Sequence, residues 1–462
     1  MLHAKRRPPP LPTTRFVPAS SSPSTYKDKD IRPPSIRVRL QRACTKPTTL
    51  VAAFLLVFVG TAWLLGLVGH RGERVRLGGG LKVVARDWSS GLGTAGALGG
   101  ALIDETGLAA PAKAYNETVL ILCPMRNAIE HIWHFFHLVD TLTYPRHLIH
   151  LAMLVSDSSD RTYARALELA DERQYSRSYR GRRYGRISVF QQDFAATEGS
   201  DAGAYAGANV GKERHEYDAQ VGRRKALGKS RTWLLNSAMA PEVDWALWLD
   251  VDLVDHEPTL IERLMEHARA EGPAGGGDVV VPNCVWKTYN EMGAYDRNNW
   301  IETPESLAMK ANLSASDVLI EGYKDHPTHR FNLASLVPSD PAASLSSNPY
   351  LALSPLPLSS LQHWPPPDLT LPPPLSSATV VPTSLSLDGV GGCAALVRAP
   401  VHREGAIFPA WPPVDHQLET EGFAQLVKAL RRTGGADGEV GPGGRGRLLG
   451  LPRYYVYHGL YG

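Results

Sequence analysis

The sequence predicts an α/β fold with a mixed, mostly parallel sheet flanked by helices, and three observations support this prediction. Short apolar runs alternate along the chain with longer segments in which apolar residues recur every three or four positions. The short runs are typical of buried strands and the longer segments of helices, and their alternation is typical of a largely parallel sheet. Polar clusters also follow two of the apolar runs, at 156–160 and 250–252, where ligands bind in such sheets.

The same patterns place the individual elements. Strands are predicted over residues 119–123, 148–155, 187–190, 243–249, 278–281, 393–397 and 451–458. Helices are predicted over about 128–142, directly after 156–160, over about 221–240, from Pro258 onward, and over about 417–432. Pro145 ends the first helix because a proline disfavours helical backbone in the residue before it. Pro258 suits the first turn of a helix, where its missing N–H costs nothing.

Two carboxylates end the apolar run at 243–249. Asp250 and Asp252 are two positions apart, so in an extended chain their side chains point the same way. Ionised carboxylates are costly to bury without a partner, whereas a divalent cation accepts carboxylate oxygens and leaves positions open for phosphate. The pattern therefore predicts a metal site with Asp250 and Asp252 as ligands. A surface turn with two solvated aspartates is the alternative.

The amino-terminal part of the chain predicts a membrane anchor. Residues 1–49 are rich in Lys, Arg and Pro, which is typical of a disordered basic tail. Residues 50–69 contain no charged side chain over a length that spans a bilayer, and the basic tail before them predicts a type II topology. Residues 70–116, rich in Gly and Ala, are expected to form a luminal stem, and residues 117–462 a luminal domain.

Sequons and cysteines add weaker indications about the luminal part. Asn116 and Asn312 begin glycosylation sequons. Cys123, Cys284 and Cys393 lie in apolar, strand-like contexts, for which buried free thiols are expected rather than a disulfide framework. The net charge of +3 is too small to indicate a nucleic-acid partner.

Residues 337–385 interrupt the α/β pattern. Pro, Ser and Leu dominate this stretch, and its apolar residues show no sustained period. A structureless stretch of this length is unusual inside a domain. It is either an insertion that loops out into solvent or the translation of an intron, and the sequence leaves both possibilities open.

Several segments, taken in order, resemble one protein family. They are LILCPMRN at 120–127, LVSDSSD at 154–160, RTWLLNSAM at 231–239, WALWLDVDLV at 245–254, YDRNNWIE at 295–302, LIEGYKDHPTHR at 319–330, LDGVGG at 387–392, HREGAIFP at 402–409, ETEGFA at 419–424 and GLPRYYVYH at 450–458. Together they resemble the fungal Golgi mannan polymerase α-mannosyltransferases of the Anp/Van type. The resemblance runs from about residue 119 to residue 458, apart from 337–385.

This resemblance implies a GT-A-like, Rossmann-type glycosyltransferase fold behind one transmembrane helix in the Golgi membrane. It implies transfer of mannose, with retention, from GDP-mannose to a mannose-terminated N-glycan acceptor, with an α-1,6 mannan backbone as the expected product. It also implies a manganese-like cation, Mn²⁺, and other mannosyltransferase subunits as partners in a hetero-oligomeric complex.

The resemblance also implies roles for particular residues. Asp250 and Asp252 match the family's metal-binding aspartates, and His458 matches its carboxy-terminal metal-binding histidine; a neutral imidazole suits Mn²⁺. Asp296 matches a carboxylate at the active centre, so Asp250 and Asp296 are the catalytic candidates; an Asx turn is the alternative for Asp296. Arg223 matches an arginine that faces the donor, where a guanidinium can bind phosphate oxygens. An ordinary solvated helix face is the alternative for Arg223, and Arg224, Lys225 and Arg231 are expected to belong to such a face.

Five further residues are expected to contact the nucleotide sugar. Pro124, Arg126 and Asp157 follow the first two predicted strands, where nucleotide sites form in such sheets; pairing of Arg126 with Asp157 on the surface is the alternative. Asp388 and Gly389 lie in a glycine-rich turn that could let the backbone approach the sugar, although a tight structural turn explains them equally well.

Glu419 and Glu421 are the candidates for the acceptor site. Both lie at the predicted start of a helix, where the helix dipole favours carboxylates in any case.

Three other interpretations of the whole chain stay open. One is a different metal-dependent GT-A glycosyltransferase that uses another nucleotide sugar. The second is a low-activity scaffold subunit of the same complex. The third is a defective product of a wrong gene model, which residues 337–385 suggest.

Overall fold

The computed structural model describes residues 73–78, 81–89, 116–194, 217–270, 276–287, 292–339, 356–366, 369–430 and 446–459. The predicted tail at 1–49 and transmembrane helix at 50–69 lie outside these residues. Within the described ranges, no helix combines the length and hydrophobicity that a bilayer requires.

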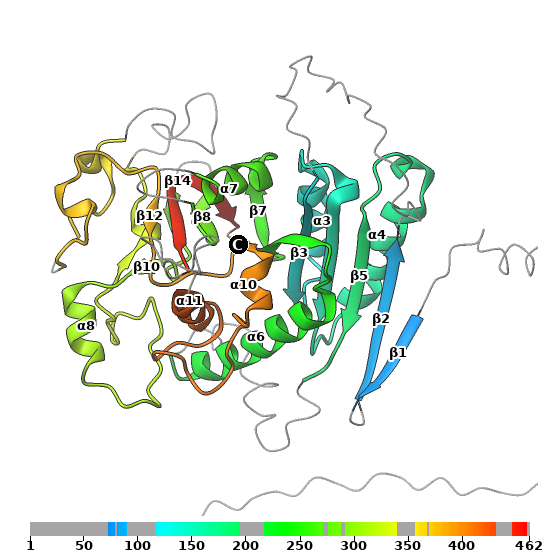
Figure 1. Ribbon diagram of the computed structural model, residues 1–462, viewed down its shortest axis with the longest axis horizontal. Coiled ribbons are helices and arrows are strands. Elements are labelled where there is room, and N and C mark those ends of the chain that lie inside the picture. Colours follow the sequence, from blue (N-terminus) through cyan, green and yellow to red (C-terminus); the bar gives the residue numbers. More distant parts are fainter. Residues whose placement is uncertain are drawn as a thin grey trace, which may run out of the picture. The chain divides into compact units, whose positions relative to one another are not determined.

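One mixed sheet forms the centre of the domain, in the order β1-β2-β5-β4-β3-β6-β13-β8-β14-β12 (Figure 1). Its strands are β1 (Glu73–Gly78), β2 (Leu81–Ser89), β3 (Thr118–Met125), β4 (Ile149–Val155), β5 (Arg186–Gln191), β6 (Val243–Leu249), β8 (Val279–Lys287), β12 (Leu385–Ser386), β13 (Ala394–Arg398) and β14 (Leu448–His458). Neighbours among β5, β4, β3 and β6 are parallel, as are β8 and β14. β13 runs antiparallel between β6 and β8. The predicted α/β fold with a mixed sheet is confirmed.

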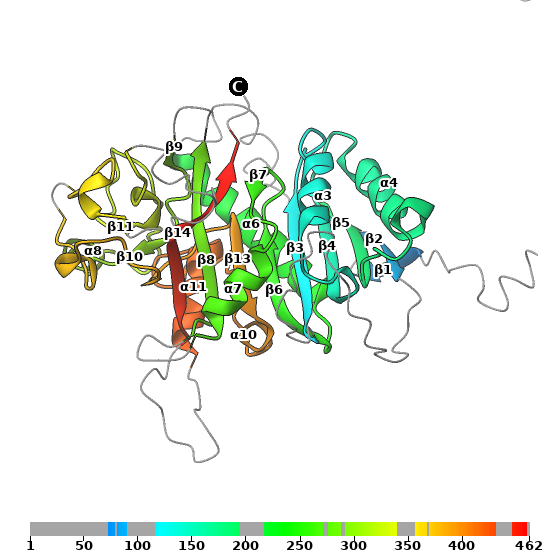
Figure 2. The same ribbon diagram turned by 90° about the horizontal axis from the view of Figure 1, so that it is seen from above.

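Helices cover both faces of this sheet. On one face, α3 (Ile132–Thr141), α4 (Thr162–Tyr175) and α7 (Leu260–Ala268) pack on a shared apolar cluster. Figure 2 shows α3 and α4 next to one another over β3, β4 and β5. On the other face, α6 (Tyr217–Ala238), α10 (Ala399–Arg403) and α11 (Glu419–Ala429) pack on a second cluster.

Burial on both faces explains the continuous apolar run of β6. Trp245, Leu247 and Leu249 pack into the first cluster, and Ala246 and Trp248 into the second. A strand with two buried faces has no polar side to alternate with. Asp250 follows directly after this buried strand.

The sheet extends further than the sequence predicted. Part of the predicted stem, 70–116, forms β1 and β2, and β2 pairs antiparallel with β5. The prediction of a luminal stem over 70–116 did not include these two strands. Strand β5 would otherwise be a sheet edge with unpaired backbone groups, and such edges are usually covered. Gly and Ala dominate the wider stretch and conceal the short strand pattern.

The Pro/Ser-rich stretch at 337–385 packs against the domain where it is described. It contains two short 3₁₀ turns, η7 (Leu358–Ser360) and η8 (Leu375–Ser377). Its apolar side chains join the second core cluster: Leu356, Leu358, Leu361, Leu375 and Val381. The expectation that the stretch loops out into solvent is therefore wrong for these residues, because its scattered leucines act as apolar anchors without helical or strand periodicity.

Two of the cysteines differ from the prediction. Cys284 and Cys393 form a disulfide across a sequence separation of 109, whereas free thiols were expected. They lie on β8 and directly before β13, which are neighbours in the sheet, and their distance in sequence hides this. Cys123 is buried and free, as predicted.

Candidate functional site

Side chains far apart in the sequence meet at the carboxyl ends of β6 and β14. Asp252 lies between β6 and β7 (Leu253–His256), and its Oδ2 is 3.0 Å from Nε2 of His458, the last residue of β14. The Tyr295 hydroxyl lies 2.9 Å from the same nitrogen. The Tyr295 and His458 rings stack with their centroids 3.8 Å apart. The antiparallel pairing of β7 with β14 brings Asp252 and His458 together.

Asp252 and His458 favour each other's charged forms. Burial acts to raise the pKa of Asp252, but the hydrogen bond and the charge of His458, together with the nearby His131, outweigh it and lower the pKa. Burial acts to lower the pKa of His458, but the hydrogen bond to Asp252 and the charges of Asp252 and Asp250 together outweigh it and raise the pKa. The two side chains therefore attract each other at the carboxyl edge of the sheet.

Asp252 and His458 supply two side chains of the type that binds a divalent cation. A carboxylate and an imidazole are both ligands that Mn²⁺ accepts. Across the part of the chain that the structure describes, however, no three His, Cys, Asp or Glu side chains are grouped to hold a metal ion. Asp252 and His458 are therefore the residues whose contact suits a cation, with Asp250 two residues away.

Asp250 is held by an arginine that the sequence did not single out. Nη2 of Arg231 donates to Oδ1 of Asp250 at 3.0 Å, and Nε of Arg231 donates to Oε1 of Glu419 at 2.7 Å. The Asp250 backbone N–H donates to the Cys393 carbonyl at 2.9 Å. Burial raises the pKa of Asp250 to about 7, although the Arg231 guanidinium opposes this shift.

Asp296 lies on the segment between β9 (Met292–Ala294) and β10 (Trp300–Ile301) and is buried. Its Oδ1 accepts hydrogen bonds from the backbone N–H and the side-chain amide of Asn298, at 3.0 and 2.9 Å. The Asx turn considered as the alternative is therefore present. Burial raises the pKa of Asp296 against the backbone amides of Asn298 and Cys393, which favour its charged form. Its chemical role stays a prediction.

Two glycines pack directly against these groups. A Cβ on Gly391 would lie 1.8 Å from Oδ2 of Asp296, and a Cβ on Gly392 would lie 2.6 Å from Nη2 of Arg231. The turn before β13 can approach both side chains only because neither residue has a side chain.

Gly391→Ala is expected to displace Asp296 and to lower both stability and any activity that depends on this carboxylate. We expect a destabilisation of about 1–3 kcal/mol, the usual cost of overpacking a buried site. The midpoint of thermal unfolding measures it. In an Asp296→Ala background the added methyl group meets no carboxylate, so its effect should largely disappear. Equal losses in both backgrounds would contradict the proposed clash.

The arginines of α6 also differ from expectation. Arg224 and Arg231 are 6% and 3% exposed, so the prediction of a solvated face is wrong for them. They are seven positions apart, which is two helical turns and therefore one face, and this spacing was the signal that sequence reasoning overlooked. Arg223 is exposed, its Nη1 donates to Oε1 of Gln220 at 3.4 Å, and its charge lies near Tyr295. Lys225 lies over the Trp411 ring.

The two glutamates predicted for the acceptor are buried beside these arginines. Glu419 is 5% exposed, bonds Arg231 and has a left-handed backbone with φ 52°. Glu421 is fully buried, with Oε2 at 3.2 Å from Nη1 of Arg224. Burial raises the pKa of Glu421 to about 7, with Arg224 opposing. Both carboxylates already have buried partners, and an acceptor contact stays a prediction.

The residues predicted for the nucleotide lie at the ends of β3 and β4. Nε of Arg126 donates to the Asp157 carbonyl at 3.1 Å, so these two residues do come together. Asp157 has a left-handed backbone with φ 47°, and its N–H donates to Oδ1 of Asp193 at 2.9 Å. Pro124 is half-buried on β3. These residues share the carboxyl edge of the parallel strands with Asp250.

Asp388 and Gly389 have structural contacts. Asp388 pairs with Lys428 of α11 and accepts a hydrogen bond from the Glu302 N–H at 2.8 Å. A Cβ on Gly389 would lie 2.2 Å from the Trp300 ring. Their contacts fix the turn before β13, and a contact with sugar stays a prediction.

The two asparagines that begin the predicted glycosylation sequons, Asn116 and Asn312, are exposed.

Comparison with known proteins identifies related chains. The family model described as Anp1 matches residues 103–412. The chain is 31% identical to the "Mannan polymerase II complex anp1 subunit" of Schizosaccharomyces pombe, over 74% of this chain and 64% of that protein. It is 30% identical to the "Mannan polymerase II complex ANP1 subunit" of Saccharomyces cerevisiae, over 74% and 55%. This chain therefore covers less than two thirds of either relative.

Among solved structures, similarity extends to "Mannosyltransferase PcManGT from Pyrobaculum calidifontis in complex with GDP-Man and Mn2+". The identity is 10%, the TM-score is 0.33, and 76% of this chain and 59% of that chain are covered. A TM-score this low supports no conclusion about the present chain. The sequence resemblance to mannan polymerase subunits, by contrast, is confirmed by the family model and the curated relatives.

Proposed function

The chain belongs to the Anp1 family, and from this premise we propose that it is an α-mannosyltransferase subunit of a mannan polymerase complex. It transfers mannose with retention from GDP-mannose to the mannose-terminated outer chain of an N-glycan, extending an α-1,6 backbone. The observation that carries this proposal is the meeting of Asp252 and His458 beside Asp250 at the carboxyl edge of the sheet. Sugar nucleotides bind at such edges.

We assign each side chain at this edge of the sheet a separate role. Asp252 and His458, with Asp250, would hold Mn²⁺, which when bound acts as a Lewis acid toward the diphosphate. Arg231 keeps the Asp250 carboxylate in place through a charge-assisted hydrogen bond from its Nη2. Arg223, exposed on α6, binds phosphate oxygens of the donor. Asp296 contacts the reacting sugar or the acceptor hydroxyl, and Arg126 and Asp157 contact the nucleotide.

A Golgi location completes the proposal, with residues 50–69 as a type II anchor and the catalytic domain in the lumen. Two observations support it. The Cys284–Cys393 disulfide suits an oxidising compartment, and the sequons at Asn116 and Asn312 are exposed. Other mannosyltransferase subunits are the proposed partners, because the relatives are named as complex subunits.

A low-activity scaffold subunit is the second candidate. It is favoured by the engagement of Asp250 with Arg231. A scaffold would keep the fold and its buried ion pairs without turning over a donor.

A transfer assay separates these possibilities. The full-length chain, purified with any co-purifying subunits, is incubated with GDP-mannose and an α-1,6-mannobiose acceptor, with Mn²⁺ or with EDTA. We expect trisaccharide with Mn²⁺ and none with EDTA, and its linkage and anomeric configuration can be assigned by NMR. UDP-glucose is the control donor. Transfer from UDP-glucose instead of GDP-mannose would favour a different glycosyltransferase, and no transfer by an assembled complex would favour the scaffold.

A further inference from the structure

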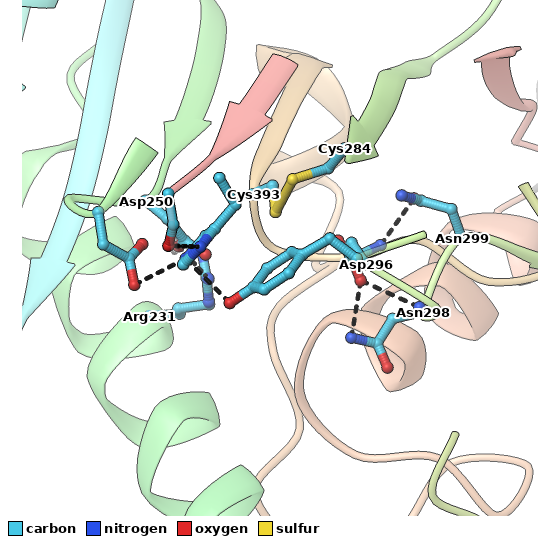
Figure 3. The surroundings of a disulfide bond; sticks show 12 residues. Arg231, Asp250, Cys284, Asp296, Asn298, Asn299 and Cys393 are labelled. Atoms are coloured by element: carbon cyan, nitrogen blue, oxygen red, sulfur yellow. Dashed lines mark hydrogen bonds and ion pairs between the residues drawn. A yellow bond between two sulfur atoms is a disulfide. The ribbon is translucent and has the colours of Figure 1, made fainter. Parts of the chain in front are cut away.

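The disulfide joins two strands at the point where their hydrogen bonding ends. Strands β13 and β8 pair through Leu396 with Val280 and Val397 with Val279. Cys393 precedes β13, and Cys284 lies further along β8, on the side of the site. In Figure 3, Asp250 and Arg231 lie on one side of the disulfide and Asp296 and Asn298 on the other. Beyond the short ladder, the disulfide is therefore a covalent link between the two segments.

Each cysteine binds the main chain of one catalytic candidate. The Asp250 N–H donates to the Cys393 carbonyl at 2.9 Å, and the Asp296 N–H donates to the Cys284 carbonyl at 3.1 Å. The Cys393 backbone amide also favours the charged form of the Asp296 carboxylate. The two aspartates are 46 positions apart in the numbering (296 minus 250) and belong to different segments. Through these bonds, the linked cysteines set the position of one aspartate relative to the other.

The surrounding turn leaves little room for adjustment. Gly391 approaches Oδ2 of Asp296 and Gly392 approaches Nη2 of Arg231 so closely that a Cβ on either glycine would force the neighbouring side chain to shift. Gly391 also donates its N–H to Oδ1 of Asn299 at 2.9 Å. A shift of Cys393 would move this turn, and with it both Asp296 and the arginine that holds Asp250.

We infer that the Cys284–Cys393 disulfide is a positioning element of the reaction centre, which holds Asp250 and Asp296 in one fixed geometry. This inference rests on the proposed function, since it assigns the two aspartates to one reaction. A misplacement of about 1 Å in such a centre can cost about 10²-fold in rate. The disulfide therefore supports turnover in the folded protein in addition to its stability.

The test compares three full-length chains at a temperature where each is folded: wild type, Cys284→Ala/Cys393→Ala, and the control Cys123→Ala. The control removes a buried free thiol from the same core cluster. We expect the double variant to lose about 10²-fold in kcat with a much smaller change in KM for GDP-mannose. We also expect faster hydrogen exchange in peptides that contain Asp250 or Asp296, but not in peptides from β4. The control should match wild type in all three measurements.

A folded double variant with kcat and exchange rates within twofold of wild type would overturn the inference and leave the disulfide a stabilising cross-link only. If the double variant does not fold, Cys284→Ala/Cys393→Val restores apolar volume and is measured in its place. If wild type transfers no mannose, the proposed function fails. The exchange rates at Asp250 and Asp296 then still show whether the disulfide fixes their positions.

Discussion

Asp250→Asn is expected to abolish mannose transfer while leaving the fold intact. Asparagine keeps an oxygen that can accept the Arg231 hydrogen bond but removes the negative charge that a cation or a charged transition state requires. We expect a loss of roughly 10³-fold in kcat/KM, since such electrostatic stabilisation contributes several kcal/mol and each 1.4 kcal/mol is about tenfold. The assay is transfer from GDP-mannose with Mn²⁺, together with thermal unfolding to confirm that the variant is folded.

The matched control for this variant is Asp244→Asn, on the same strand. Asp244 lies near the other end of β6, where its Oδ2 accepts a hydrogen bond from the Thr118 N–H at 2.8 Å. It should retain transfer activity. If Asp250→Asn elongated mannan as well as wild type in an assembled complex, the catalytic assignment would be wrong and the scaffold interpretation would gain support.

Arg231→Met is expected to give the largest loss of stability of any single change in the site. The guanidinium is buried between Asp250 and Glu419, so its removal leaves a buried carboxylate without its partner. Breaking a buried ion pair by removing one member costs about 3–5 kcal/mol. Thermal unfolding of the full-length chain measures the effect, and transfer activity should fall with it because Asp250 loses its fixed orientation.

Two comparisons make the Arg231 result specific. In Arg231→Met/Glu419→Gln the uncompensated charge of Glu419 is gone, so part of the lost stability should return. Arg165→Met removes an exposed partner of Glu168, 2.9 Å away on α4, and should cost less than about 1 kcal/mol. If Arg165→Met and Arg231→Met lowered the stability by similar amounts, the burial of the Arg231 ion pairs would not explain the loss.

Much of the architecture could be predicted from local pattern. The strands that became β3, β4, β5 and β6 appear in the sequence as short apolar runs, because a strand buried on both faces has no polar side. The helices show the recurrence that one apolar face imposes. The start of α11 near Glu419 followed from its acidic first turn. The missed hairpin, β1 and β2, lies in a Gly- and Ala-rich stretch where that signal is weak.

The site residues were predicted individually, whereas the arginines that pair with their carboxylates were not. Asp250 and Asp252 stand out because two carboxylates directly after an apolar strand are costly without a ligand. Arg231 and Arg224 do not stand out, since a basic residue on a helix is usually solvated. Only packing shows that this face of α6 is covered by the turn before β13 and by the start of α11. The same packing directs Glu419 and Glu421 toward arginines.

The sequence by itself determined which segments are strands and helices, where the apolar run ends in aspartates, and which family the chain resembles. These properties depend on residues close together along the chain. Tertiary structure alone decided that His458 meets Asp252, that Arg231 holds Asp250, and that Cys284 bonds Cys393. Each of these contacts joins segments far apart in sequence, and only the order and direction of strands in the sheet bring such segments together.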